Sequence, residues 1–192
     1  MKHILFIVFI GLFITNSSAS PFGLKMGMSL KEITAVSTAK PEKLDKGIYV
    51  IQPKKSHPQF KTYLAYVDKK KGLYQIRAVS PTIKTNPYGT ELQNHFYDIK
   101  NRISKTYGEP IIRNEINEDS PFQGDEYWLH TLKDGARTLA AIWGKDSKLD
   151  ENLDLIVLEC GVDNSLFGGP YLILFYYFKN SDGVEDDIDS VF

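Results

Sequence analysis

Cys160 is the only cysteine of the chain, and a thiolate beside a histidine is a strong nucleophile. The histidines that could act as its base are His57, His95 and His130. Leu158, Cys160 and Val162 alternate along a predicted strand onto one apolar face, where a cysteine behaves as a small hydrophobic residue. The pattern therefore favours inert packing. A small exported hydrolase that uses Cys160, or a serine–histidine pair assembled in space, is the alternative interpretation.

The segment Ser37-Thr38-Ala39-Lys40 matches the Ser-x-x-Lys signature of penicillin-recognising enzymes, in which a lysine one helical turn away activates a serine. Those enzymes also require Ser-Asp-Asn and Lys-Thr-Gly elements, and the sequence contains neither of them. Pro41 ends the helix immediately after Lys40. The segment is therefore predicted to be a frayed helix end rather than a catalytic site.

Metal and cofactor sites are not predicted by any spacing in the sequence. The histidines stand far apart, and the acidic run 182–187 lacks the alternating ligands of a calcium-binding loop. Gly168 and Gly169 lead into a predicted strand, whereas a phosphate loop leads into a helix N-terminus. We expect no metal and no cofactor.

The formal net charge of −1 gives no electrostatic reason to expect nucleic acid or an anionic membrane as a partner. The 11 tyrosines are more than a core of this size easily satisfies, because each buried hydroxyl needs a hydrogen-bond partner. Some tyrosines are thus expected at the surface, where tyrosine is enriched in protein interfaces. The leading interpretation is a non-enzymatic binding protein, an inhibitor or immunity-type protein, that acts on a protein partner in the cell envelope.

The first twenty residues have the order of a cleavable secretory signal. Lys2 and His3 are followed by an apolar run from Ile4 to Ile14 and by the small residues Ser18-Ala19-Ser20. The run is too short for a spanning helix, so no stable membrane insertion is expected after cleavage. The sequence predicts a signal peptide at residues 1–20 and a periplasmic or secreted protein.

Two helices are expected to position any site. Ser29 and Glu32 form a capping box that begins a helix running to about Ala39. The second helix spans Glu91–Tyr107, with Thr90 as N-cap and Gly108 just past its end. The apolar stripe of this second helix consists of Leu92, Phe96, Ile99, Ile103 and Tyr107. Such a stripe is typical of a helix lying on a sheet.

Seven segments are expected to be strands. They are Lys46–Gln52, Phe60–Asp68, Leu73–Ser80, Asp125–Lys133, Ala136–Gly144, Leu153–Val162 and Tyr171–Phe178. The sequence thus predicts an α+β fold, with an antiparallel sheet of about six to seven strands, two helices on one face, and the order α-β-β-β-α-β-β-β-β. Residues 21–179 are expected to form a single domain, with two related halves (21–88 and 89–179) as an open alternative. Residues 180–192 are expected to be an acidic flexible tail.

Asp134-Gly135 is a strong hairpin signal between two of these strands. With a turn at this point, Trp128, His130 and Arg137 share the face that we expect to point away from the long helix. A tryptophan beside arginine and histidine is typical of an interface hot spot. These three residues are the predicted surface binding patch, and Trp128→Ala is expected to weaken partner binding by about 2 kcal/mol while hardly changing the melting temperature.

The segment Phe22–Ile33, with its Phe-Gly start and Gly27-Met28-Ser29 before a capped helix, resembles the opening of a broad group of small exported bacterial proteins. Many of those proteins place a helix ending in Tyr-Gly-x-Pro near mid-chain, to which Tyr107-Gly108-Glu109-Pro110 is similar. The layout also resembles β-lactamase inhibitor proteins and small lipoproteins of outer-membrane assembly. The resemblance implies a compartment and a fold, and it assigns no functional residue.

Overall fold

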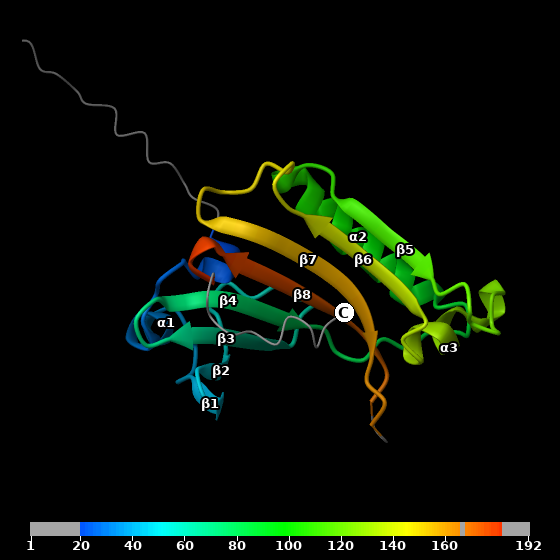
Figure 1. Cartoon of the computed structure of the whole chain (residues 1–192). Coiled ribbons are helices and arrows are strands. Elements are labelled where there is room, and N and C mark those ends of the chain that lie inside the picture. Colours follow the sequence, from blue (N-terminus) through cyan, green and yellow to red (C-terminus); the bar gives the residue numbers. More distant parts are fainter. Residues whose placement is uncertain (1–19, 166–167, 182–192) are drawn as a thin grey trace, which may run out of the picture.

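The protein has an α+β fold in which one eight-stranded antiparallel sheet is packed against helices (Figure 1). The computed structural model describes residues 20–165 and 168–181. The strands are β1 (Glu42–Asp45), β2 (Ile48–Ile51), β3 (Thr62–Asp68), β4 (Gly72–Val79), β5 (Ile111–Ile116), β6 (Arg137–Trp143), β7 (Leu153–Val162) and β8 (Pro170–Phe178). The helices are α1 (Leu30–Ala35), α2 (Thr90–Tyr107) and α3 (Trp128–Lys133), with short 3-10 helices η1 (Pro21–Gly23), η2 (Asp125–Tyr127) and η3 (Lys179–Ser181). The predicted fold class is confirmed, with a sheet slightly larger than expected.

The strand order is β1-β2-β3-β4-β8-β7-β6-β5, so the last strands of the two halves meet at the centre of the sheet. At this junction Ile76 of β4 faces Tyr176 of β8, and Ala78 faces Leu174. Each half places a helix before four strands, and α3 is inserted between β5 and β6 in the second half. The suggested kinship of the two halves stays a prediction.

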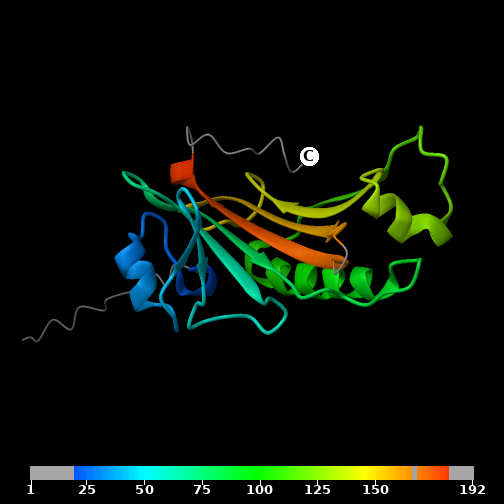
Figure 2. The same ribbon diagram turned by 90° about the horizontal axis from the view of Figure 1, so that it is seen from below.

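The helices lie on one face of the sheet, which Figure 2 shows with α2 running beneath the strands. The predicted stripe of α2 is buried against β7 and β8, and Leu92 and Phe96 are fully buried. Ile33 of α1 joins the same apolar cluster. Trp143 of β6 ties the sheet to the end of α2, because its indole Nε1–H donates to the Gly108 carbonyl at 2.8 Å.

Helices α1 and α2 each differ slightly from their predicted bounds. The capping box of Ser29 and Glu32 is present, but α1 ends at Ala35 rather than near Ala39, because Ser37 forms a β-bridge with Pro53. The N-cap of α2 is Gly89 in a left-handed conformation, and Thr90 is the first helical residue, so the predicted N-cap was one position too late.

The predicted hairpin at Asp134-Gly135 is wrong. Residues 125–133 form η2 and α3, and Asp134 and Gly135 end that helix: the Asp134 N–H donates to the His130 carbonyl and the Gly135 N–H to the Leu132 carbonyl. A glycine with positive φ, here +71°, ends a helix as readily as it turns a hairpin. Strand β6 pairs instead with β5 on one side, where Ile111 faces Ile142, and with β7 on the other.

The second face of the sheet, opposite α2, carries its own apolar cluster of Val157, Phe175 and Tyr177, all buried.

Within the described residues, no helix is long and apolar enough to cross a membrane. The predicted signal peptide, residues 1–20, falls almost wholly on residues 1–19, which lie outside the described residues. Of the predicted tail, residues 180–192, Asn180 and Ser181 belong to η3, and residues 182–192 lie outside the described residues.

Candidate functional site

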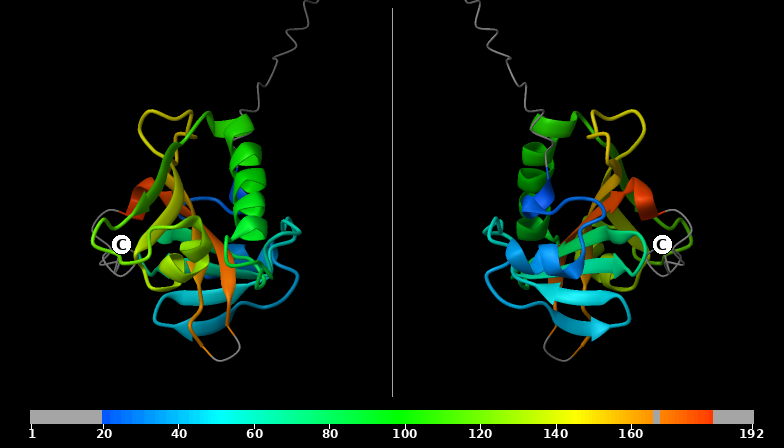
Figure 3. Two further views of the ribbon diagram at one scale, coloured as in Figure 1. Left: turned by 90° about the vertical axis from the view of Figure 1, so that its right-hand side faces the viewer. Right: turned by 90° about the vertical axis from the view of Figure 1, so that its left-hand side faces the viewer.

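A groove with a volume of about 410 Å³ lies where α2, β5 and α3 come together. It is lined by Tyr88, Thr90, Gln93, Asn94, Tyr97, Asn114, Asp125, Trp128 and Arg137. Figure 3 (left) shows this end of the molecule facing the viewer, with α2 beside β5. The lining combines aromatic rings with amide and charged side chains, the composition typical of a recognition surface.

Trp128, one of the three predicted patch residues, is only 4% exposed. The prediction of an outward-pointing Trp128 was wrong because residues 128–133 are helical, and the side of α3 that carries Trp128 and Leu132 packs into the core. The Leu129 N–H donates to the Pro87 carbonyl at 2.9 Å, which holds the start of α3 against the loop that enters α2. Trp128 therefore closes the inner end of the groove and is mainly a packing residue.

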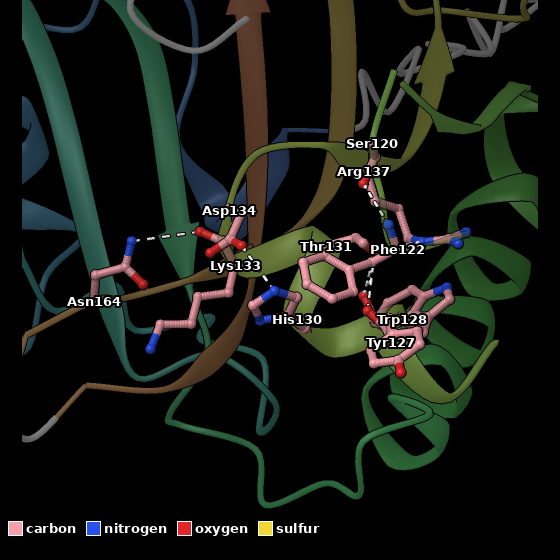
Figure 4. A network of polar contacts seen from close by, with 10 residues as sticks. All are labelled: Ser120, Phe122, Tyr127, Trp128, His130, Thr131, Lys133, Asp134, Arg137 and Asn164. Carbon is pink, nitrogen blue, oxygen red and sulfur yellow. Dashed lines mark hydrogen bonds and ion pairs between the residues drawn. The ribbon is translucent and has the colours of Figure 1, made fainter. Parts of the chain in front are cut away.

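Arg137, the second predicted residue, lines the same groove and is half-buried. Its Nε donates to the Thr131 hydroxyl at 3.1 Å, and its guanidinium lies 5.8 Å from the centre of the Trp128 ring (Figure 4). The Thr131 hydroxyl lies 3.0 Å from the Tyr127 and Trp128 carbonyls, to which it can donate. These contacts fix Arg137, and no hydrogen bond within the described residues takes its terminal nitrogens, so a ligand in the groove can bind them.

His130 does not line the groove with the other two residues. It lies on α3 with its Nε2 3.1 Å from Asp134 Oδ2, and its ring contacts Phe122 edge-to-face at 4.6 Å between centroids (Figure 4). Phe122 also contacts the exposed ring of Tyr127. The structure thus brings Trp128 and Arg137 together and places His130 in a neighbouring exposed aromatic cluster.

Sequence reasoning missed the exposed aromatic residues around the groove. Tyr88 is 52% and Tyr97 39% exposed. Among the described residues, the large hydrophobic side chains that are exposed are Leu44, Tyr88, Tyr97, Ile111, Ile112, Phe122 and Tyr127. All of these except Leu44 lie on β5, on α2 or in the segments next to α2 and α3. Tyr97 could have been found from the sequence, because it falls outside the apolar stripe of the predicted helix.

Strand β5 forms one edge of the sheet beside this groove. The Asn117 N–H donates to the Ala136 carbonyl, so by alternation Ile112, Asn114 and Ile116 direct their backbone groups away from β6. The opposite edge, β1, has only four residues, three of them charged, and its register is irregular. Short, charged, irregular edges resist pairing, so of the two edges β5 is the more open to another strand.

Cys160 is 2% exposed and belongs to the main apolar cluster. Burial, and secondarily the charge of Glu159, raises the pKa of its thiol far above the ordinary value, so the thiol stays protonated. In the part of the chain that the structure describes, no hydrogen bond joins Cys160 to a histidine. The geometry gives the Cys160 hydrolase alternative no support.

We therefore expect Cys160 to be inert toward a thiol reagent in the folded protein. Ellman's reagent should titrate less than about 0.1 thiol per chain in native buffer and one thiol per chain in 6 M guanidinium chloride. The rate in native buffer should be limited by unfolding. Rapid native labelling would show that the cysteine is accessible and would reopen the thiol mechanism.

The remaining chemical candidates lie apart from one another. The Ser37 hydroxyl donates to the Ile33 carbonyl at 2.8 Å, and Lys40 is exposed beyond the end of α1. His57 lines a separate, mostly apolar cavity of about 260 Å³, where burial and then the charge of Arg102 lower the pKa of its imidazole. Over residues 20–165 and 168–181, no three His, Cys, Asp or Glu side chains are grouped so as to hold a metal ion.

The resemblance to small exported bacterial proteins stays a prediction, carried by the two short motifs at Phe22–Ile33 and Tyr107–Pro110. Comparisons of the chain with protein-family models, with curated proteins and with solved structures find no match.

Proposed function

We propose that this chain is an exported, non-enzymatic binding protein that takes up an extended segment of a protein partner along the edge of β5. The observation that carries the proposal is the coincidence of an open edge strand with a groove lined by exposed aromatic rings. Addition of a strand to a sheet edge supplies affinity through backbone hydrogen bonds and specificity through pockets for alternate side chains. The first twenty residues support the export part of the proposal.

The geometry of β5 sets out how such a segment would bind. Its backbone would pair with the outward N–H and C=O groups of Ile112 and Asn114. Asn114 faces Leu139 across the pair, which places it on the face that carries α2. Every second side chain of the bound segment would project over that face into the groove, where Tyr97 and Arg137 lie.

The aromatic composition of this end supports a protein rather than a small molecule as the ligand. The exposed rings of Tyr88 and Tyr97 line the groove, those of Phe122 and Tyr127 lie in the neighbouring aromatic cluster, and tyrosine and phenylalanine are enriched in protein interfaces. Arg137 supplies a fixed cation, and Asp125 supplies an anion on the same groove. An inhibitor or immunity-type role uses such a surface, and it is the class of activity that we propose.

The variant Asn114→Pro tests the proposal, because proline removes the outward backbone donor and blocks strand addition. The residue before it, Arg113, is already extended in β5, so the β5–β6 ladder is retained. We expect the free energy of unfolding to fall by about 1 kcal/mol or less, and partner capture to fall at least about tenfold. Capture is measured by a photo-crosslinking amino acid at Ile112 in the producing cells, followed by mass spectrometry of the adducts.

The matched control is the same photo-crosslinker at Leu44 on β1, the exposed hydrophobic residue of the opposite edge. Lys43→Pro on that edge is the control for the proline substitution. Equal adducts from residues 112 and 44, or adducts at residue 112 that persist in Asn114→Pro, would contradict binding along β5.

A further inference from the structure

Arg77 of β4 lies on the sheet face opposite α2, where aromatic rings surround its guanidinium group. Its guanidinium carbon lies 4.4 Å from the centre of the Tyr66 ring and 5.3 Å from that of Phe175. Among the residues that the structure describes, the buried Arg77 Nε has no hydrogen-bond partner, and an Arg77 Nη2–H donates to the Gln75 side-chain oxygen over a long distance of 3.5 Å. Among the described residues no carboxylate pairs with this cation.

The surroundings of Arg77 form a continuous face built by three adjacent strands. Phe175 faces Arg77 across the β4–β8 pair, and Tyr177 faces Gln75. The Gln75 side chain is fully buried, and within residues 20–165 and 168–181 its Nε2 also has no hydrogen-bond partner. We call Tyr66, Gln75, Arg77, Phe175 and Tyr177 the Arg77 face. A half-buried cation and a buried amide donor on an aromatic surface call for an anionic, hydrogen-bond-accepting occupant.

We infer that the acidic C-terminal segment of this chain, residues 182–192, binds the Arg77 face. The segment contains Asp182, Glu185, Asp186, Asp187 and Asp189. Its sequence also carries Val184, Ile188, Val191 and Phe192, which suit an apolar aromatic surface. Carboxylates near Arg77 supply the missing counter-charge.

The described residues end at Ser181, close to the strand that carries Arg77. η3 follows β8 directly and packs against β4. The Asn180 side-chain amide donates to the carbonyls of Lys71 and Leu73 at 2.9 and 3.0 Å. Ser181 therefore lies close to the first residues of β4, next to the Arg77 face. The eleven residues from 182 to 192 span up to about 36 Å when extended, whereas the three strands that build the Arg77 face are together about 10 Å wide. The segment is long enough to cross it.

Paramagnetic relaxation enhancement in the full mature chain tests the inference. A nitroxide label is attached at Ser190→Cys, and buried Cys160 stays unlabelled. We expect the amide signals of Arg77, Phe175 and Tyr177 to lose at least about twofold more intensity than those of Phe96 and Ile99 on α2. The difference should shrink in 1 M NaCl, because exposed charges are screened.

Two sets of variants test the charge pairing. Replacing Asp186, Asp187 and Asp189 with asparagine leaves the described fold untouched and should abolish the difference between the faces, as should Arg77→Gln. Arg113→Gln, an exposed arginine of edge strand β5, is the matched control and should preserve it. Equal broadening of both faces, a difference that survives the asparagine variant, or broadening seen only between mixed molecules would overturn the inference.

Discussion

Replacing Trp128 with alanine is expected to lower the free energy of unfolding by about 4 kcal/mol, as is typical when a buried tryptophan is removed from a core. The indole is 4% exposed, packs in the main cluster and lies directly beneath Gly89. Its loss leaves a cavity at the point where α3, the start of α2 and β6 meet. Urea unfolding followed by far-UV circular dichroism measures the change. This result would replace the sequence-based expectation of weaker binding at unchanged stability.

The variant Gly89→Ala tests the packing of Trp128 against Gly89 from the other side of the contact. A Cβ at residue 89 would lie 2.1 Å from Trp128 Cε3, and the φ of +68° at Gly89 already disfavours any side chain. In a double-mutant cycle, Gly89→Ala should cost about 1–2 kcal/mol less when Trp128 is already alanine, because the clash is gone.

Tyr88→Ala serves as the control for this cycle. Tyr88 adjoins Gly89 in the chain but is exposed, so its loss should change stability by about 0.5 kcal/mol or less. A Trp128→Ala variant as stable as the wild type would show that the indole is not buried as described. A cycle with purely additive effects would show that Gly89 and Trp128 do not pack together.

The parts of the fold that could be predicted are those in which local pattern and burial agree. Strand β7 has the predicted bounds, because its apolar run is buried on both faces of the sheet. Helix α2 has the predicted stripe and the predicted C-terminal glycine. Strand β5 was missed because the sequence Ile-Ile-Arg-Asn-Glu-Ile alternates poorly, and the strand is mostly exposed at the sheet edge.

Residues 125–133 were predicted to be a strand because the motif that follows them, Asp134-Gly135, is compatible with two structures. Asp134-Gly135 suits a hairpin turn and the end of a helix equally well, since both need a residue with positive φ. The spacing of Trp128 and Leu132, four residues apart, was the helical signal that the turn motif outweighed. With the helix in place, the side chains predicted to face solvent turn toward the core.

The candidate groove could not be derived from sequence, because its residues come together only through the sheet topology. Tyr97 on α2, Asn114 on β5 and Arg137 on β6 are distant in the chain and meet because β5 pairs at the outer edge of β6. Composition indicated surplus tyrosine, and the structure places two exposed tyrosines, Tyr88 and Tyr97, on this groove. The strand pairing that locates them is long-range information that no local pattern contains.

Glu159 is expected to make the free energy of unfolding depend strongly on pH. It lies on β7 between Ala140 and Ile173, on the face opposite α2, and in the part of the chain that the structure describes no hydrogen bond or ion pair reaches its carboxylate. Burial raises the pKa of this carboxyl from its ordinary 4.5 to about 7. Glu159 and Asp163, after burial, also raise the pKa of the Tyr171 hydroxyl.

Because the folded pKa of Glu159 is raised, the folded state holds this proton more tightly than the unfolded state does. Its contribution to stability is fully present below pH 4.5 and is lost as the pH rises to about 7, a fall of about 3 kcal/mol. His57 acts in the opposite direction over part of this range, since its lowered imidazole pKa makes the fold more stable as the pH rises. The contribution of Glu159 is therefore isolated by comparison with Glu159→Gln, which keeps the shape and cannot ionise.

We expect the free energies of unfolding of the wild type and Glu159→Gln to lie close together at pH 4.5 and to diverge by about 3 kcal/mol at pH 8, with the variant more stable. Urea unfolding at half-unit pH steps gives both curves, and Glu115→Gln, an exposed carboxyl on β5, is the matched control that should show no divergence. If the wild type and Glu159→Gln ran parallel from pH 4.5 to 8, the carboxyl would be well solvated, and the second face of the sheet would be open to water around Glu159.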